Sequence, residues 1–138
     1  MTQNIFESFD KIRYEGSGSR NPLAFRHYDP DRMVLGKTIA EHLRVAVCYW
    51  HSFAWPGADI FGEGVFDRPW KPGTPATQEL AELKALNAFT FFEKLGAPFY
   101  TFHDADVMAA APTPREYVAN LGRAVEMLAG HQERSGVR

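Results

Sequence analysis

The chain contains two apolar runs, each followed by a stretch with helical periodicity. The first run, residues 43–50, reads Leu-Arg-Val-Ala-Val-Cys-Tyr-Trp and is almost entirely apolar. Near-continuous apolar runs are typical of parallel strands that are buried on both faces. The second run, residues 98–102, reads Pro-Phe-Tyr-Thr-Phe and is rich in aromatic, β-prone side chains. We therefore predict a strand over each run.

A helix is predicted after each strand. Thr74-Pro75 offers an N-cap with proline at the first helical position, and Gly96 offers a stop. Residues 113–116, Thr-Pro-Arg-Glu, form a capping box for the second helix, which we expect to end near Ser135, before Gly136. The apolar residues expected to face the sheet are Leu80, Leu83, Leu86, Phe89, Phe92 and Leu95 in the first helix, and Tyr117, Leu121, Ala124, Val125 and Leu128 in the second.

The order of these elements predicts an α/β fold. Residues 1–42 are expected to form an irregular N-terminal arm that includes a short helix around residues 33–43. Residues 43–138 are expected to form two β/α units, with a third strand beginning at residue 137. Two units are a quarter of a (β/α)₈ TIM barrel, which usually needs about 250 residues. We therefore predict a partial barrel, either part of a longer chain or completed by other copies.

The long loop predicted between the first strand and the first helix is rich in glycine, proline and aromatic residues. Residues 51–73 are interrupted by glycine and proline and carry Phe61, Phe66 and Trp70. Loops of this length in compact domains are usually functional or dock on a partner. We therefore expect a subunit contact in this loop, with the following residues 107–112 forming a second, shorter loop after the second strand.

Composition and charge exclude several classes of function. The net charge is −2, with 15 Lys+Arg against 17 Asp+Glu, so neither a nucleic-acid footprint nor a membrane-surface patch is expected. No apolar run approaches the roughly 18 residues of a membrane span, and Met1-Thr2-Gln3-Asn4 begins no signal-peptide pattern. Cys48 is the single cysteine, which we interpret as a core residue of a cytoplasmic protein.

Polar residues follow the second strand directly, at positions His103, Asp104 and Asp106. In β/α barrels the active site is built at the carboxyl ends of the strands, so His103 and Asp106 are candidate catalytic residues. A helix cap or a loop salt bridge is the structural alternative. A metal site made of the three side chains is a further alternative, less favoured because adjacent ligands on an extended chain point in different directions.

Seven segments along the chain together carry a resemblance to one family. They are residues 21–25 (Asn-Pro-Leu-Ala-Phe), 36–37 (Gly-Lys), 41–44 (Glu-His-Leu-Arg), 48–51 (Cys-Tyr-Trp-His), 57–62 (Gly-Ala-Asp-Ile-Phe-Gly), 66–70 (Phe-Asp-Arg-Pro-Trp) and 102–106 (Phe-His-Asp-Ala-Asp). With these segments in this order, the chain resembles the N-terminal part of xylose isomerases of the longer, class II type. One departure is the loop at residues 107–112, where the family usually carries a Pro-Glu-Gly run.

The resemblance implies a barrel enzyme that assembles as a homotetramer and converts D-xylose to D-xylulose, and D-glucose to D-fructose. It implies ring opening and then a hydride shift assisted by two divalent cations (Mg²⁺, or Mn²⁺ or Co²⁺), with metal ligands outside this chain. It also implies that His103 helps open the sugar ring and that Asp106 holds its imidazole. Trp50 would pack against the sugar, and Phe61 would reach into a neighbouring subunit's site.

Two other functions remain open on the sequence alone. The first is a related metal-dependent sugar isomerase or epimerase on a similar barrel. The second is a catalytically inactive barrel fragment that acts only in assembly. We expect the 138-residue chain by itself to be inactive, because it supplies no metal ligands.

Overall fold

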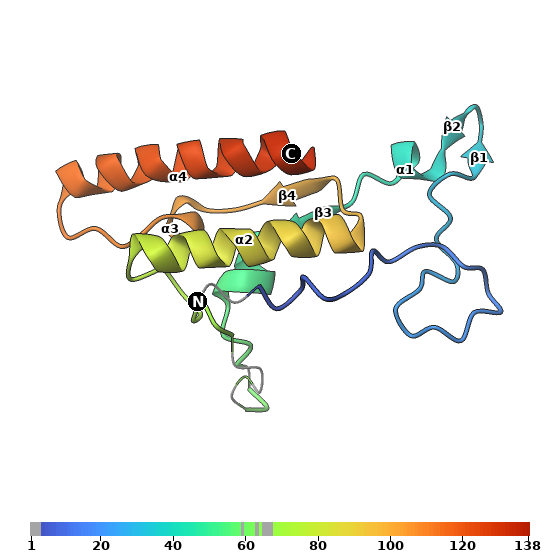
Figure 1. Ribbon diagram of the computed structural model, residues 1–138, viewed down its shortest axis with the longest axis horizontal. Helices are drawn as coiled ribbons and strands as arrows, with labels where there is room; N and C mark the ends of the chain where they lie inside the picture. The colour runs from blue at the N-terminus through green and yellow to red at the C-terminus, as the bar shows by residue number, and fades with distance from the viewer. Residues whose placement is uncertain (1–3, 59, 63, 65–67) are drawn as a thin grey trace.

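The computed structural model describes residues 4–58, 60–62, 64 and 68–138, and has short strands and longer helices in a mixed α/β arrangement (Figure 1). Strands β3 (Ala46–Cys48) and β4 (Phe99–Thr101) pair in parallel. Their register places Cys48 opposite Thr101. Both predicted strands are confirmed, although the paired parts are shorter than the apolar runs.

The end of the chain adds to the other edge of β4. The Arg138 amide donates to the Pro98 carbonyl, and the Arg138 carbonyl accepts from the Tyr100 amide, both at 3.0 Å. One residue bonded to two alternate residues of its neighbour is the parallel ladder pattern. Val47 lies opposite Tyr100 on the β3 side, so β4 lies between β3 and Arg138. These two bonds agree with the predicted start of a third strand.

Two long helices, α2 (Gln78–Leu95) and α4 (Pro114–Ser135), run alongside the strands (Figure 1). The N-cap of α2 is Thr77 rather than the predicted Thr74. The Thr77 side chain accepts a hydrogen bond from the Leu80 amide at 3.3 Å. The carbonyl of Pro75 instead accepts from the Ala110 amide at 2.7 Å, which ties the residues before α2 to the loop before α4.

The start of α4 and the glycine stops of both helices follow the sequence prediction. Thr113 caps α4, accepting from the Glu116 amide at 3.3 Å. Gly96 and Gly136 end α2 and α4 with φ angles of 75° and 74°. This left-handed conformation costs glycine little, because glycine has no Cβ.

The buried face of α2 differs from the predicted leucine stripe. Phe89 and Phe92 are buried as expected, but the leucines are only half-buried at the flanks. Small residues let the helix approach the sheet closely, and two polar residues are buried with them. The buried residues of α2 are Ala81, Lys84, Ala85, Asn87, Ala88, Phe89 and Phe92.

The two faces of the β3–β4 pair have different surroundings. On one face, Tyr100 is buried, stacks on Phe92 and accepts a hydrogen bond from Gln132 of α4. Ala46 and Thr101, which point to the other face by strand alternation, are exposed. Both helices therefore cover one face of the sheet and leave the other open.

The predicted short helix around residues 33–43 is wrong over its first half. Strands β1 (Met33–Val34) and β2 (Lys37–Thr38) form an antiparallel hairpin there. Its two turn residues, Leu35 and Gly36, have φ angles of 49° and 80°, as a two-residue hairpin turn requires. Only α1 (Ile39–His42), capped by the preceding threonine, is helical.

Short helices also occupy two segments that were predicted as loops. The π-helix η1 (Trp50–Ala54) follows β3, and α3 (Asp104–Val107) follows β4, so that Val107 is helical. In the part of the chain that the structure describes, no helix is both long enough and apolar enough to cross a membrane.

Candidate active site

The parallel pairing brings the ends of β3 and β4 to one edge of the sheet. Cys48 and Thr101 are the last paired residues, and Trp50 and His103 each follow two positions later. His103 keeps an extended backbone after β4, whereas Trp50 begins η1. Trp50 and His103, singled out separately from the sequence, therefore follow neighbouring strand ends.

His103 and Asp106 form a bonded pair. The imidazole Nδ1 of His103 lies 3.1 Å from Oδ2 of Asp106, and the His103 backbone amide donates to the same oxygen at 2.8 Å. The His103 side chain is 71% exposed, whereas that of Asp106 is 6% exposed. A buried carboxylate thus fixes the orientation of an exposed imidazole. Because Nδ1 faces Asp106, proton exchange with a bound molecule falls to Nε2.

Asp104 is directed to a different partner. Its carboxylate accepts a hydrogen bond from the Tyr117 hydroxyl of α4. That bond is the main cause that lowers the pKa of Asp104, and it raises the pKa of Tyr117. No three His, Cys, Asp or Glu side chains in residues 4–58, 60–62, 64 and 68–138 are grouped to hold a metal ion. Asp104 and Asp106 are thus bonded to different partners, Tyr117 and His103.

Two neighbouring rings, those of His51 and Trp55, lie against the Trp50 indole. Its ring stacks with that of Trp55 at 6.3 Å between centres and 15° between planes, and the His51 ring meets it edge-on at 4.4 Å. Trp50 remains 39% exposed. An exposed, rigidly held indole is a surface on which the apolar face of a small ligand can pack.

The long loop matches its prediction only in part. Phe61 is 90% exposed, but Phe66 lies outside the described residues. Trp70 is 1% exposed and donates from Nε1 to the Phe53 carbonyl at 2.8 Å. Trp70 is therefore a core residue, and the expectation that it contributes to a subunit contact is wrong.

Sequence reasoning missed a polar group beneath the pair. Lys84 of α2 is 0% exposed, and Tyr49, next to the end of β3, is also 0% exposed. Burial lowers the pKa of Lys84 to about 8 and raises that of Tyr49 well above its usual range, while the charge of Asp106 raises both. The available signal was a lysine within the apolar stripe of a helix, at the spacing of Ala81, Ala85 and Ala88.

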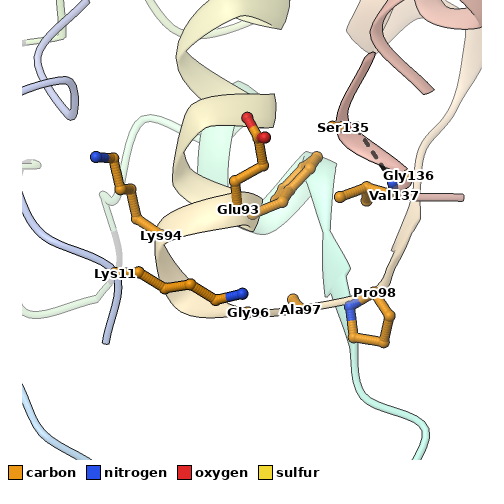
Figure 2. Close-up of a pocket in the computed structure, with 10 residues that line it drawn as sticks. Lys11, Glu93, Lys94, Gly96, Ala97, Pro98, Ser135, Gly136 and Val137 are labelled. Atoms are coloured by element: carbon orange, nitrogen blue, oxygen red, sulfur yellow. Dashed lines mark hydrogen bonds between the residues drawn. The ribbon is translucent and has the colours of Figure 1, made fainter. Parts of the chain in front are cut away.

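A cleft lies on the side of the molecule opposite to the His103–Asp106 pair. This cleft, of about 570 Å³, opens between the carboxyl ends of α2 and α4. Figure 2 shows Lys11, Glu93 and Lys94 near Gly96 on one side, and Gly136 on the other. Gly96 precedes β4 and Gly136 precedes the Arg138 segment, so this cleft is at the amino ends of the strands. In β/α barrels, residues at that end of the strands usually contribute to stability rather than to catalysis.

The fold and the site define an α/β protein with a histidine–carboxylate pair at the carboxyl edge of its parallel strands. No model of a known protein family matches the chain. The xylose isomerase of Burkholderia vietnamiensis is 60% identical over 136 residues, 98% of this chain and 30% of that protein. The xylose isomerase of Escherichia coli is 56% identical over 137 residues, 99% of this chain and 31% of that protein.

The resemblance to xylose isomerases is thereby confirmed along nearly the whole chain. The Burkholderia thailandensis xylose isomerase, at 58% identity over 136 residues, gives the same result. The chain spans about 30% of the length of these curated relatives, which is consistent with an N-terminal portion.

Proposed function

We propose that this chain forms the first two β/α units of a (β/α)₈ barrel and is a segment of an aldose–ketose isomerase. The observation that carries the proposal is the bonded pair of His103 and Asp106 at the carboxyl edge of parallel strands. The similarity to xylose isomerases supports D-xylose as substrate and D-xylulose as product, with D-glucose and D-fructose as the second pair.

In this proposal His103 assists ring opening and Asp106 orients it. A cyclic aldose opens when a proton leaves the anomeric hydroxyl and another reaches the ring oxygen. An imidazole held through Nδ1 presents Nε2 for such a transfer. Trp50 packs on the apolar side of the sugar, and Phe61 reaches the site of a neighbouring subunit in a homotetramer.

Two divalent cations, Mg²⁺ or else Mn²⁺ or Co²⁺, belong to the same proposal. The described residues do not fit them, since no group of three metal-binding side chains occurs among these residues. The ligands are therefore expected outside this chain, and the roles given to His103 and Asp106 involve no cation. A cytoplasmic location completes the proposal.

An assembly role without catalysis is the second candidate. The exposed face of the β3–β4 pair favours it, because an uncovered sheet face, with Ala46 and Thr101 exposed, is suited to packing against further chain. The two candidates differ in whether His103 matters to turnover.

The test is a hybrid in which this chain replaces the matching part of the Burkholderia vietnamiensis xylose isomerase. We expect the hybrid to form D-xylulose from D-xylose with Mg²⁺. His103→Ala should slow that turnover by about 10² to 10⁴-fold, the usual contribution of general acid–base catalysis, with cation affinity nearly intact.

His27→Ala is the matched control, because His27 is an exposed histidine of the N-terminal segment, and it should leave turnover unchanged. A hybrid that assembles but is inactive would favour the assembly role. Loss of cation binding in His103→Ala, as large as the loss of turnover, would identify His103 as a metal ligand instead.

A further inference from the structure

Helix α4 contacts the segment that follows β4 through two polar side chains. The Tyr117 hydroxyl donates to the carboxylate of Asp104, at the start of α3. The Asn120 side chain donates to the carbonyls of Ala109 and Ala110, at 2.9 Å and 3.2 Å. Residues three positions apart lie on one face of a helix. A single face of α4 is therefore bonded both to the start of α3 and to the loop that follows it.

The loop after α3 is held firmly. Val107, Met108 and Ala109 are buried in the core. The Ala110 amide donates to the Pro75 carbonyl at 2.7 Å, which joins the loop to the residues before α2. This end of the segment is therefore fixed by packing as well as by hydrogen bonds.

The start of α3 has much less packing to hold it. His103, Asp104 and Ala105 are all exposed. The hydrogen bond from Tyr117 joins this exposed end to α4, and the Tyr117 ring itself packs against the core. A helix of four residues is far too short to be stable alone, so α3 depends on bonds of this kind.

Asp104 is coupled to the His103–Asp106 pair through the backbone. It follows His103 directly, and its carbonyl accepts from the Met108 amide at 3.3 Å, which closes the turn. In the same turn the Asp106 amide donates to the His103 carbonyl at 3.0 Å. Movement of Asp104 away from α4 would therefore change the angle at which the imidazole meets its carboxylate.

We propose that Tyr117 is a positioning residue for His103, which it holds by bonding to Asp104 and so fixing the turn of α3. The inference rests on the proposed function in taking His103 as the group that acts on the sugar. The alternative is that Tyr117 matters only through its ring, as part of the apolar contact between α4 and the core. Tyr117→Phe separates the two, because it keeps the ring and removes the hydroxyl.

Amide hydrogen exchange on the full 138-residue chain tests the link without sugar or metal. In Tyr117→Phe, exchange of the His103 and Met108 amides should become faster by about tenfold, the effect of losing one typical hydrogen bond. The Ala110 amide, in the firmly held loop, should exchange as in the wild type. Tyr14→Phe is the matched control, because Tyr14 is 43% exposed in the N-terminal segment, and it should change none of these rates.

Two exchange results would overturn the inference. One is an unchanged rate at His103, and the other is an equal acceleration at His103 and Ala110, which would indicate general destabilisation. The acceptor side gives a further check. In an Asp104→Ala background, Tyr117→Phe should cause no additional change at His103. An additional change as large as that in the wild-type background would show that the hydroxyl acts through another group.

The hybrid with the Burkholderia vietnamiensis xylose isomerase supplies a catalytic measurement. Tyr117→Phe should lower kcat for D-xylose by about tenfold, because misplacing a catalytic group is costly, with KM and cation affinity nearly unchanged. Combined with His103→Ala, it should slow turnover no further than His103→Ala alone, since Tyr117 acts through His103. Additive losses in the double variant would overturn the positioning role.

The two proposals can fail separately. An inactive hybrid, together with selectively faster exchange at His103, overturns the proposed function and leaves Tyr117 as the residue that orients the pair. A hybrid that is slowed by His103→Ala, but keeps wild-type exchange and turnover in Tyr117→Phe, overturns the positioning role alone.

Discussion

Lys84 differs from Lys94, the other lysine of α2, in the surroundings of its ammonium group. Lys84 is fully buried, whereas Lys94 is partly exposed and reaches the Glu7 carbonyl at 3.4 Å. The pKa of Lys84 falls from 10.5 to about 8 because of burial. Folding and proton binding are therefore coupled at this residue.

The direction of that coupling predicts a pH dependence. Between pH 8 and 10.5 the unfolded chain binds more protons at Lys84 than the folded chain, so stability rises with pH there. Relative to Lys84→Met, the free energy of unfolding of the wild type should increase across this window by on the order of 3 kcal/mol. Urea unfolding at several pH values measures it, and parallel curves for the two proteins would contradict it.

The contacts of a residue could be predicted from the sequence where its partner is only a few positions away. His103 and Asp106 are three positions apart after a strand, so one turn of helix brings them together. Lys84 could not be placed in this way, because its partners Gly73 and Tyr49 lie outside its own helix. Its burial depends on how α2 packs against two other segments, which a helical period alone does not define.

At the scale of elements, α4 depends on its first turn. Thr113 accepts from the Glu116 amide, and its hydroxyl donates to the Glu116 carboxylate at 2.5 Å. Thr113→Ala removes both bonds and should lower the free energy of unfolding by about 1 kcal/mol. Thr113→Ser keeps the hydroxyl and should cost much less. Equal losses in chemical denaturation would show that the cap is not responsible.

Element positions were predictable where a cap or glycine marks them, as at Thr113, Gly96 and Gly136. The start of α2 was not, because Thr74 and Thr77 both have the chemistry of a cap. The Pro75 carbonyl accepts a hydrogen bond from the Ala110 amide rather than from the next turn of a helix, so α2 begins after Thr77. The hairpin at residues 33–38 was missed because Leu35, rather than glycine or asparagine, adopts a positive φ.

At the scale of the whole molecule, the uncovered sheet face predicts association. Ala46 and Thr101 are exposed on the side away from α2 and α4, and Trp50, just after β3, is 39% exposed. Exposed apolar patches and open strand edges promote pairing between chains. The chain should therefore show a mass above that of a monomer in sedimentation experiments, increasing with concentration.

A charge on that face should reverse the effect. Ala46→Lys is expected to lower the average mass, while Val118→Lys should not, since Val118 is 68% exposed on the outer surface of α4. A wild-type chain that remains monomeric at every concentration would contradict the expectation. So would equal effects of the two substitutions.

The N-terminal segment lies against a helix that follows it by some eighty residues of chain. The Asn4 side chain donates to Thr90, and the Ile5 amide donates to Asn87, at sequence separations of 86 and 82. By contrast, β3 and β4 pair across a separation of 53 residues, as from Ala46 to Phe99. Closing a long loop is entropically costly and slow. During synthesis, residues 4 and 5 leave the ribosome before α2 and therefore cannot reach their final position until α2 has emerged.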